Sequence, residues 1–514
     1  MAKEKVVIGN EGISDARVLG KTRMIVLGIQ HMFAMFGATV LVPLLTGLNV
    51  STTLLWAGLG TLLFHLITKG KIPAFLGSSF AFLGGYAAIA PMDGAGGMTN
   101  AQLLPYACLG VACAGLVYLL LALLIKLVGV TRVMRFFPPV VTGPIIIGIG
   151  LILAPTAVNN CRTNWVLALV ALGIIIIFNI WGKGMTKIIP IILGVIGAYA
   201  VGLILYFIGQ ANPDLIQNYP AIFAGGINDA GVYLPLFDFT GVKAIFTNIS
   251  NGDIWGNLID IPIYKDSTVL GIDWSNISLI ISSIFAIMPI SLATIMEHIG
   301  DISAISATTG KNFIANPGLH RSLTGDGLAT SLASLFGGPA NTTYGENTGV
   351  LALTKVYDPK VIRIAACFAV GISFFPLVSA LISTIPTSVI GGISFVLYGM
   401  ISSVGVRNMV ESKVDFTKSR NLIIAAVILV CSLGLGTGIS FVFGKFEIIL
   451  SALAVAAIVG IILNAVLPGK DYEFKVEKPK TTGVDFAIGE NAVSLSEEKS
   501  IEEEENKENK NSSD

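Results

Sequence analysis

The fold is decided by ten residues, Asn341-Thr342-Thr343-Tyr344-Gly345-Glu346-Asn347-Thr348-Gly349-Val350. They follow Gly337-Gly338-Pro339 and precede a short apolar run that reaches Lys355. A carboxylate and two amides therefore occur where the surrounding hydropathy indicates the depth of the lipid. Irregular backbone survives at that depth only where it is buried in protein or lines a wet cavity. The stretch predicts a site lined by Glu346, with the remaining chain as its scaffold.

The composition is that of a polytopic membrane protein. Of the 514 residues, 54% are hydrophobic and 12% are charged, and the mean hydropathy is +0.79. Soluble chains carry roughly 25% charged residues. The net charge is zero, so nucleic acid is not an expected partner. The five cysteines show no CxxC spacing, and we expect them to be buried small side chains without a metal or disulfide role.

About fourteen crossings are expected, because a full crossing needs about 20 apolar residues. Two of them look broken: the third, where the stretch 69–80 with its Gly and Pro is followed by a run too short to span, ending near 89, and the tenth, which is the opening stretch. Each is expected to be a short extended piece followed by a half-helix. The regular spans are predicted at 24–45, 52–68, 103–128, 138–157, 165–181, 188–208, 277–301, 323–336, 362–382, 390–406, 422–435 and 448–467.

The third and tenth segments occupy the same place in two halves of seven spans. Because seven is odd, the second half is expected to be inverted relative to the first. Paired interrupted spans in corresponding halves point to a transporter's substrate site near the middle of the membrane. The sequence therefore predicts an all-α membrane protein with a seven-plus-seven inverted repeat.

The loop charges predict the orientation of the chain. Lysine and arginine gather in alternate loops, whereas the opposite loops are nearly uncharged or acidic. The largest of these, 211–273, holds seven Asp against two Lys. By the positive-inside rule both termini are cytoplasmic and this loop faces out. No cleavable signal peptide is expected, because the N-terminus opens polar.

Two half-helices meeting near mid-membrane would direct their unsatisfied backbone N–H groups into one cavity. Their starts are predicted at Ser79 or Phe80 and at Gly345. A glycine there lets a ligand approach the backbone closely. Such donors suit carbonyl oxygens or anions.

Two intramembrane carboxylates, Glu297 and Glu346, add acceptors for N–H groups of a ligand. Together with the helix starts they favour a flat neutral solute with alternating C=O and N–H groups, whose ring could rest on Phe80 or Tyr344. The alternative for each carboxylate is a structural role at a helix end. Ionisable residues inside a membrane are functional candidates by default.

Several polar residues leave two interpretations open. Asp301 lies one helical turn from Glu297 on the same face, so it could relay protons or simply approach the cytoplasmic end. His31 and His298 could be hydrogen-bonded core residues or substrate contacts. Asn347 could support the site or merely cap its half-helix.

Six motifs resemble those of the nucleobase–ascorbate transporter family (nucleobase:cation symporter-2), and most closely those of its bacterial uracil permeases. The resemblance covers residues 22–467 and excludes the 211–273 loop and the acidic tail. The motifs are Gln30-His31-Met32-Phe33-Ala34-Met35-Phe36-Gly37-Ala38-Thr39, Lys71-Ile72-Pro73-Ala74-Phe75-Leu76-Gly77-Ser78-Ser79-Phe80-Ala81-Phe82, Glu297-His298-Ile299-Gly300, Pro317-Gly318-Leu319-His320-Arg321, Glu346-Asn347-x-Gly349-x-x-x-x-Thr354-Lys355 and Glu411-Ser412-Lys413-Val414-Asp415.

The resemblance implies a substrate between the two broken segments. Glu297 and Glu346 would bond the N–H edges of a pyrimidine and one of its carbonyls. The backbone amides of Phe80 and Gly345 would donate to carbonyl oxygens. Tyr344 would shape the pocket.

The resemblance also implies a coupling group and a supporting group. Asp301, Glu297 and His31 would couple transport to protons, and Asn347 and Ser79 would support the half-helices. Bacterial uracil permeases often have His where this chain has Asp301, and purine-selective relatives more often have Asp. Proton coupling and the choice between uracil and xanthine therefore stay open at this position.

The family's architecture implies a core domain and a gate domain that move against each other, with the gate domain forming a homodimer. The implied segments are 1–21 (cytoplasmic), 22–130 (core), 131–210 (gate), 211–274 (extracellular insertion), 275–384 (core), 385–468 (gate) and 469–514 (disordered acidic tail).

The expected function is uracil import by proton symport across the cell membrane, through an elevator-type motion. No cofactor is expected besides the co-transported proton. The alternatives are a xanthine or mixed uracil/xanthine permease and, from a different class, an anion carrier of the same fold, which would want a positive site. An enzyme is not expected, because no metal-ligand cluster, nucleophile elbow or phosphate loop stands out.

Overall fold

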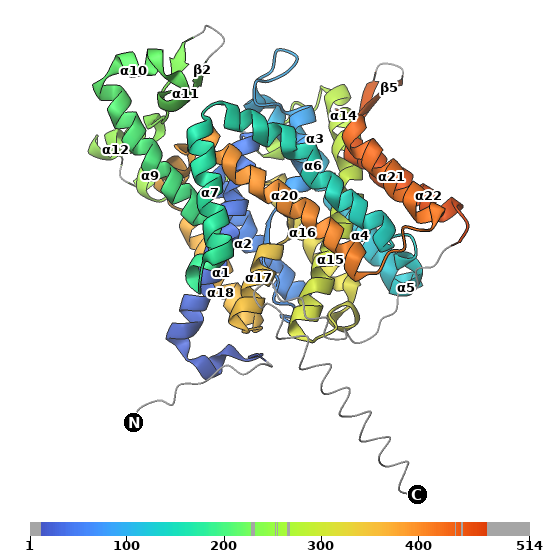
Figure 1. Ribbon diagram of the computed structural model, residues 1–514. Helices are drawn as coiled ribbons and strands as arrows, with labels where there is room; N and C mark the ends of the chain where they lie inside the picture. Colours follow the sequence, from blue (N-terminus) through green and yellow to red (C-terminus); the bar gives the residue numbers. More distant parts are fainter. Residues whose placement is uncertain are drawn as a thin grey trace, which may run out of the picture.

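The computed structural model describes residues 12–469, except 228–231, 252, 254, 265–267, 437 and 444–445. Over these residues the protein is mostly helical (Figure 1). The expected disordered tail beyond Gly469 and the first eleven residues of the N-terminal segment lie outside the described residues.

The elements follow one another in three groups. Up to residue 211 they are η1 (Ala16–Leu19), α1 (Lys21–Thr46), α2 (Val50–Ile67), β1 (Leu76–Ser78), η2 (Phe80–Phe82), α3 (Leu83–Ile89), α4 (Asn100–Val128), α5 (Val130–Met134), α6 (Pro139–Arg162), α7 (Trp165–Trp181), α8 (Met185–Ile188) and α9 (Pro190–Ala211). The insertion holds α10 (Pro213–Asn218), α11 (Pro220–Phe223), β2 (Gly226–Ile227), β3 (Tyr233–Leu234), α12 (Thr240–Ser250), α13 (Trp255–Leu258) and η4 (Val269–Gly271). Then come α14 (Ile277–Ile287), η5 (Met288–Ile290), α15 (Ser291–Thr309), η6 (Ile314–Gly318), α16 (Leu319–Leu335), β4 (Asn341–Thr343), α17 (Gly345–Thr354), α18 (Pro359–Ser373), α19 (Pro376–Ser383), α20 (Thr387–Glu411), α21 (Ser419–Gly434), β5 (Ile439–Phe443), β6 (Phe446–Leu450) and α22 (Ala452–Val466).

The helices are long and apolar enough for a multi-pass membrane protein. Within the described part of the chain, seven helices could cross a membrane by length and composition, and the bent pair α18–α19 makes a possible eighth. Their exposed side chains include many leucines, isoleucines and valines. A surface of this kind suits lipid, where helices satisfy their own backbone hydrogen bonds.

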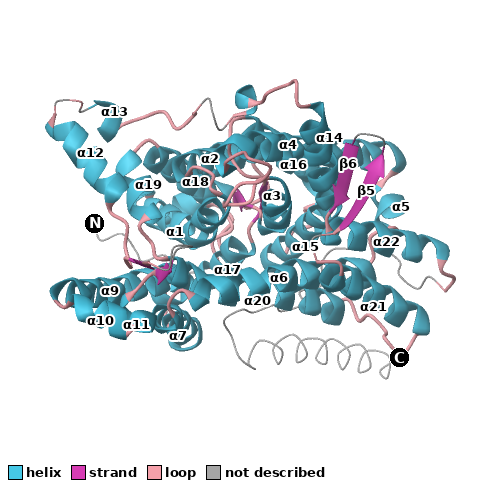
Figure 2. Cartoon of the chain, turned by 90° about the horizontal axis from the view of Figure 1, so that it is seen from above, coloured by secondary structure: helices cyan, strands magenta, loops and turns pink. Residues whose placement is uncertain are grey.

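Seen from above, the helices form two layers (Figure 2). One layer holds α2, α4, α14, α16, α18 and α19, and the other holds α6, α7, α9, α20, α21 and α22, with α1, α3, α15 and α17 nearest the line between them. Within the layers α16 packs on α4 and α2, and α6 packs along α20. The two short broken segments lie where the layers meet.

The region 362–382, expected to be one regular span, is sharply bent instead. Its two helices, α18 and α19, meet at 86°. Phe375, the residue before Pro376, is extended, with φ −101° and ψ 101°. A proline disfavours the helical conformation in the residue before it, so Pro376 ends one helix and begins the next.

Other span limits also differ from expectation. Helix α15 continues past 301 to Thr309 and ends at Gly310, which adopts the left-handed conformation that terminates many helices. Pro289 lies in η5, which separates α14 from α15. Residues 448–450 belong to strand β6 rather than to the last span, since β-branched Ile448 and Ile449 favour a strand. The helical architecture thus carries three two-stranded sheets that an all-α prediction does not include.

The insertion 211–274 is attached to both layers. Near its start, the Asn164 side chain that caps α7 donates to the carbonyls of Ile222 and Ala224 at 2.9 and 3.1 Å. Near its end, Thr52 of α2 donates to Pro262 O at 2.7 Å. It consists of short helices and the β2–β3 pair.

The described part of the N-terminal segment binds the end of α17. Ile13 pairs with Val356, and the Ala16 N–H donates to the buried Asp358 carboxylate at 2.9 Å. Asp358 also caps α18 through the Lys360 N–H. Beside it, hydrogen bonds from Arg17 hold the pKa of Asp15 well below its ordinary value. The segment is therefore packed against the broken tenth segment.

Candidate substrate site

The two broken segments are joined by a short antiparallel ladder. Strand β1 pairs with β4 in the register Leu76↔Thr343, Gly77↔Thr342 and Ser78↔Asn341. The ladder is extended at both ends, since Ser79 N donates to Ala340 O at 2.9 Å and Tyr344 N to Phe75 O at 3.1 Å. Two stretches more than 260 residues apart in sequence, as the Ser78–Tyr344 contact shows, thus become one structural unit.

Short helices leave this ladder from both strands, as the sequence indicated. The first begins at Phe80, with Ser79 extended before it, and α17 begins at Gly345, with Tyr344 extended before it. Neither start has a side-chain cap. The backbone donors of both first turns are therefore available to a ligand. Gly345 is exposed, and a Cβ there would meet no atom within 4 Å, so there is open space beside this start.

Tyr344 is buried and hydrogen-bonded at the junction. It is only 4% exposed. Its hydroxyl donates to Ser78 O at 2.9 Å and accepts from Thr39 of α1 at 3.3 Å. Its ring lies against Gly77, where any Cβ would collide with it. Tyr344 is therefore held in place at the junction, and its hydroxyl is already engaged.

Three carboxyl groups come together at the junction from two helices. Glu297 and Asp301 lie on one face of α15, and Glu346 lies in the first turn of α17, which packs against α15. Asp301 accepts from Thr343 Oγ1 of β4 at 2.7 Å. Glu297 Oε2 has no hydrogen-bond partner among the described residues. A buried acceptor without a partner is a candidate for ligand binding.

Asn347 and His31 bind each other. The Asn347 amide donates to the His31 carbonyl at 3.1 Å, and its nitrogen lies 3.2 Å from His31 Nδ1. Both residues are buried. Asn347 thus ties α17 to α1 rather than capping its own helix. No hydrogen bond described in the structure joins His31 to Glu297 or Asp301.

Phe80 contacts a residue that the sequence did not single out. Its ring meets Tyr398 of α20 edge-on, with centroids 6.1 Å apart and planes at 75°. Tyr398 is 2% exposed, and its hydroxyl has no partner in the described part of the chain. A tyrosine inside the apolar span 390–406 was the available signal. Ser79, expected to support the half-helix, also has a buried hydroxyl without a described partner.

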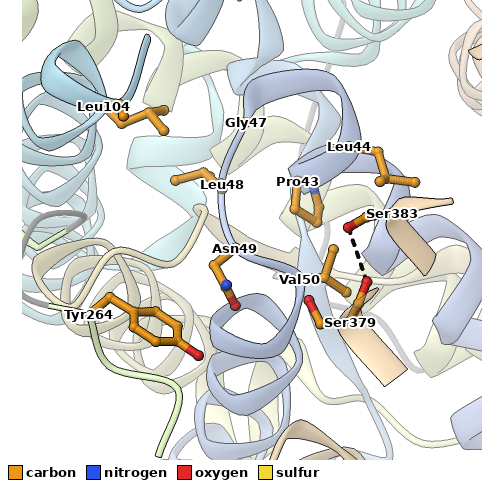
Figure 3. A pocket seen from close by; sticks show the side chains of 11 residues that line it. Pro43, Leu44, Gly47, Leu48, Asn49, Val50, Leu104, Tyr264, Ser379 and Ser383 are labelled. Atoms are coloured by element: carbon orange, nitrogen blue, oxygen red, sulfur yellow. Dashed lines mark hydrogen bonds between the residues drawn. The ribbon is translucent and has the colours of Figure 1, made fainter. Parts of the chain in front are cut away.

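Two open cavities lie away from this junction. One of about 480 Å³ lies between the α1–α2 turn, α19 and the insertion. Figure 3 shows Asn49 and Tyr264 across it from Ser379 and Ser383. A second of about 330 Å³ adjoins it through these same four residues. Burial and the hydrogen bond to Asp260 raise the pKa of Tyr264 to about 12. Neither cavity is lined by the predicted site residues.

The chain is similar to known proteins over most of its length. The sequence profile of a family described as the permease family matches residues 22–444. The uracil permease of Bacillus subtilis (strain 168) is 39% identical over 481 residues, covering 91% of this chain and 97% of its own. The uracil permease of Escherichia coli (strain K12) is 33% identical over 466 residues, covering 88% and 93%.

Among solved structures, the transmembrane domain of a cyanobacterial bicarbonate transporter, BicA, overlaps 88% of this chain and 99% of its own. Its sequence identity is 15% and the TM-score is 0.48. That overlap is too loose to carry a statement about substrate. The match over most of the chain to permeases does settle the family: the protein belongs to the permease family, the nucleobase–ascorbate transporters that its motifs resemble, and it is a multi-pass membrane transporter and not an enzyme.

Proposed function

We propose that this protein imports uracil by proton symport. The observation that carries the proposal is the junction of β1 and β4, where two uncapped helix starts lie beside Glu297 and Glu346. Uracil presents two ring N–H donors and two carbonyl acceptors. The carboxylates would accept from the N–H groups, and the backbone N–H groups of Phe80 and Gly345 would donate to the carbonyls. The names of the most similar relatives support the same substrate.

A binding panel on the purified protein tests this substrate. Isothermal titration with uracil, xanthine, uric acid, ascorbate and sulfate should give binding by uracil, with xanthine as the nearest competitor. Binding of xanthine but not uracil would replace the substrate and keep the family chemistry. Binding of sulfate alone would overturn the proposal, because two carboxylates suit neutral N–H donors rather than an anion.

We propose fourteen crossings in a seven-plus-seven inverted repeat. Besides the long helices, four shorter apolar ones at Phe80–Ile89, α7, α21 and α22 support this number, as do α16 and α17. The pairing of β1 with β4 supports two repeats that meet at their broken segments.

The two layers support a core domain of residues 22–130 and 275–384 and a gate domain of residues 131–210 and 385–468. In this proposal the core carries the site across the membrane against the gate, which also forms a homodimer. Both termini face the cytoplasm, the insertion 211–274 faces out, and the protein lies in the cell membrane.

Asp301 is proposed as the proton-coupling group. It faces Thr343 on β4 and shares its helix face with Glu297, and Glu346 approaches from α17. Intramembrane carboxyls of this kind mark proton pathways. Uptake into proteoliposomes should rise as the external pH falls. Asp301→Asn, fixed as neutral, should flatten this dependence and weaken accumulation while uracil exchange persists.

The measurement uses an imposed pH gradient, with and without sodium. Accumulation that follows sodium and ignores the proton gradient would overturn proton coupling. An unchanged pH profile in Asp301→Asn would remove that residue from the pathway while leaving the uracil site intact.

A further inference from the structure

A fully buried histidine–aspartate pair lies directly behind the proposed site. His298 Nδ1 of α15 is 2.8 Å from Asp326 Oδ2 of α16, and both side chains are 0% exposed. The His298 ring also meets Phe64 of α2 edge-on, with centroids 6.3 Å apart. His298 is thus wedged between two helices of the core layer, one residue after Glu297.

This pair contributes little to the stability of the fold. Asp326 Oδ1 and His298 Nε2 have no hydrogen-bond partner among the described residues. A buried ion pair that leaves polar atoms unsatisfied contributes little net stability, and apolar side chains of similar volume often do as well or better. Such a pair is directional, because its two side chains are in contact at only one relative position of α15 and α16.

The other packing contacts of α15 are not directional, so a directional contact is needed to fix its rotation. The buried residues one and two turns from His298 on α15 are small or aliphatic: Thr294, Ile302 and Ile305. Apolar packing of this kind is not directional.

Helix α15 is therefore held by two polar contacts three residues apart. Asp301 accepts from Thr343 of β4. His298 meets Asp326 of α16, which packs on α2 and α4. Glu297 precedes both contacts, one residue before His298 and one helical turn before Asp301. A rotation of α15 that moved Glu297 away from the junction would break the pair with Asp326.

We propose that His298 and Asp326 are positioning residues for Glu297, fixing the rotation of α15 so that the Glu297 carboxylate faces the substrate. Neither touches the substrate. The inference rests on the proposed function, because its readout is uracil binding.

Three variants of the pair separate positioning from folding. Asp326→Asn keeps the shape and removes the charge. The double variant His298→Leu with Asp326→Ala roughly conserves volume and removes every unsatisfied polar atom. His298→Gln keeps a donor towards Asp326. A matched control is Asp358→Asn, which alters another buried carboxylate of the core layer, 4% exposed and in contact with the N-terminal segment rather than the site.

Each protein is measured in detergent for its melting temperature and for its dissociation constant for uracil. The double variant should melt within a few degrees of the wild type yet bind uracil at least tenfold more weakly, and Asp326→Asn should weaken binding similarly. His298→Gln should stay within about threefold of the wild type. Asp358→Asn should lower the melting temperature and leave the dissociation constant unchanged.

A double variant that folds and binds like the wild type would overturn the proposal, as would variants that lose melting temperature without losing affinity. If Asp326→Asn does not fold, the uracil affinities of the double variant and of His298→Gln test the proposal. A wild-type protein that does not bind uracil refutes the proposed function instead, which is a different result from wild-type binding with unaffected variants.

Discussion

Two glycines at the junction have opposite surroundings. A Cβ on Gly77 would collide with the Tyr344 ring and come within 2.8 Å of Thr39 Oγ1, whereas a Cβ on Gly345 would meet nothing within 4 Å. The first glycine is required for packing. Gly345 leaves open space beside it, and in the proposed function the substrate occupies that space.

Gly345→Ala should therefore separate binding from folding. The methyl group meets no protein atom and replaces glycine in a helix, which costs no stability and can add up to about 1 kcal/mol. It would occupy the space beside the helix start, so uracil should bind at least tenfold more weakly at an unchanged or raised melting temperature. Gly371→Ala on α18, also in open space, is the control and should bind normally. Normal binding by Gly345→Ala would place the substrate elsewhere.

The carboxylates give a second prediction. Glu297→Ala and Glu346→Ala should each abolish uptake while leaving folded, membrane-inserted protein. Each substitution leaves a substrate N–H unpaired in a shielded pocket, at a cost of about 1–3 kcal/mol in binding. Titration calorimetry with uracil measures this loss. Near-normal affinity in both variants would refute the site.

At the residue scale, the sequence indicated candidate functional residues wherever a charged side chain lies inside an apolar run. Glu297, Glu346 and Asp301 stand out because carboxylates inside apolar runs need a reason, and the structure brings them together. The partners of Asn347 and His298 could not be predicted, because they depend on which helix packs behind. Asp326 lies inside the predicted span 323–336, so the same signal was present there, but nothing in the sequence identified His298 as its partner.

At the scale of elements, the junction depends on the close approach of β1 to Tyr344. Gly77→Ala should lower the melting temperature and weaken uracil binding together, because the Tyr344 ring must move and α17 begins at the next residue. Overpacking of this kind costs about 1–3 kcal/mol. Thermal unfolding and titration on the same sample make the measurement. A loss of stability with intact affinity would show that Tyr344 does not shape the site.

The bend between α18 and α19 shows what an apolar run cannot reveal. Hydropathy marks 362–382 as one span, and it does so whether the helix is straight or bent. The Phe375-Pro376 pair was the local signal for the break. Short extended pieces were predictable for the opposite reason, since Gly and Pro interrupt both broken segments. Their mutual pairing was not, because register is a property of two strands.

At the scale of the molecule, one contact crosses between the layers at a position suited to a disulfide. A Cβ built on Gly37 of α1 lies 3.1 Å from Ile191 Cβ of α9, near the roughly 3.5–4.5 Å of disulfides. Oxidation of Gly37→Cys with Ile191→Cys, in a background without the native cysteines, should stop uptake yet preserve uracil binding. Reduction should restore uptake.

The control is a matched pair inside the core. Gly28 of α1 approaches Ile364 of α18, with 2.9 Å between the corresponding Cβ positions. Oxidised Gly28→Cys with Ile364→Cys should transport normally, because both helices belong to the proposed core domain, which moves as one body in the proposed function. Transport that persists with the core locked to the gate would rule out a rigid-body motion between them.

The β1–β4 ladder bears on how such a carrier can accumulate its substrate. The two halves of the proposed site are each other's strand partners, so separating them would break the backbone hydrogen bonds of the ladder. In the proposed rigid-body motion this pairing persists, and the site keeps one shape whichever side it faces. A site of constant shape has the same intrinsic dissociation constant for uracil outside and inside. The concentration ratio that the protein sustains would then owe nothing to a switch in affinity. It would be set by how often the site crosses loaded with its proton compared with empty, and therefore by the cation gradient alone.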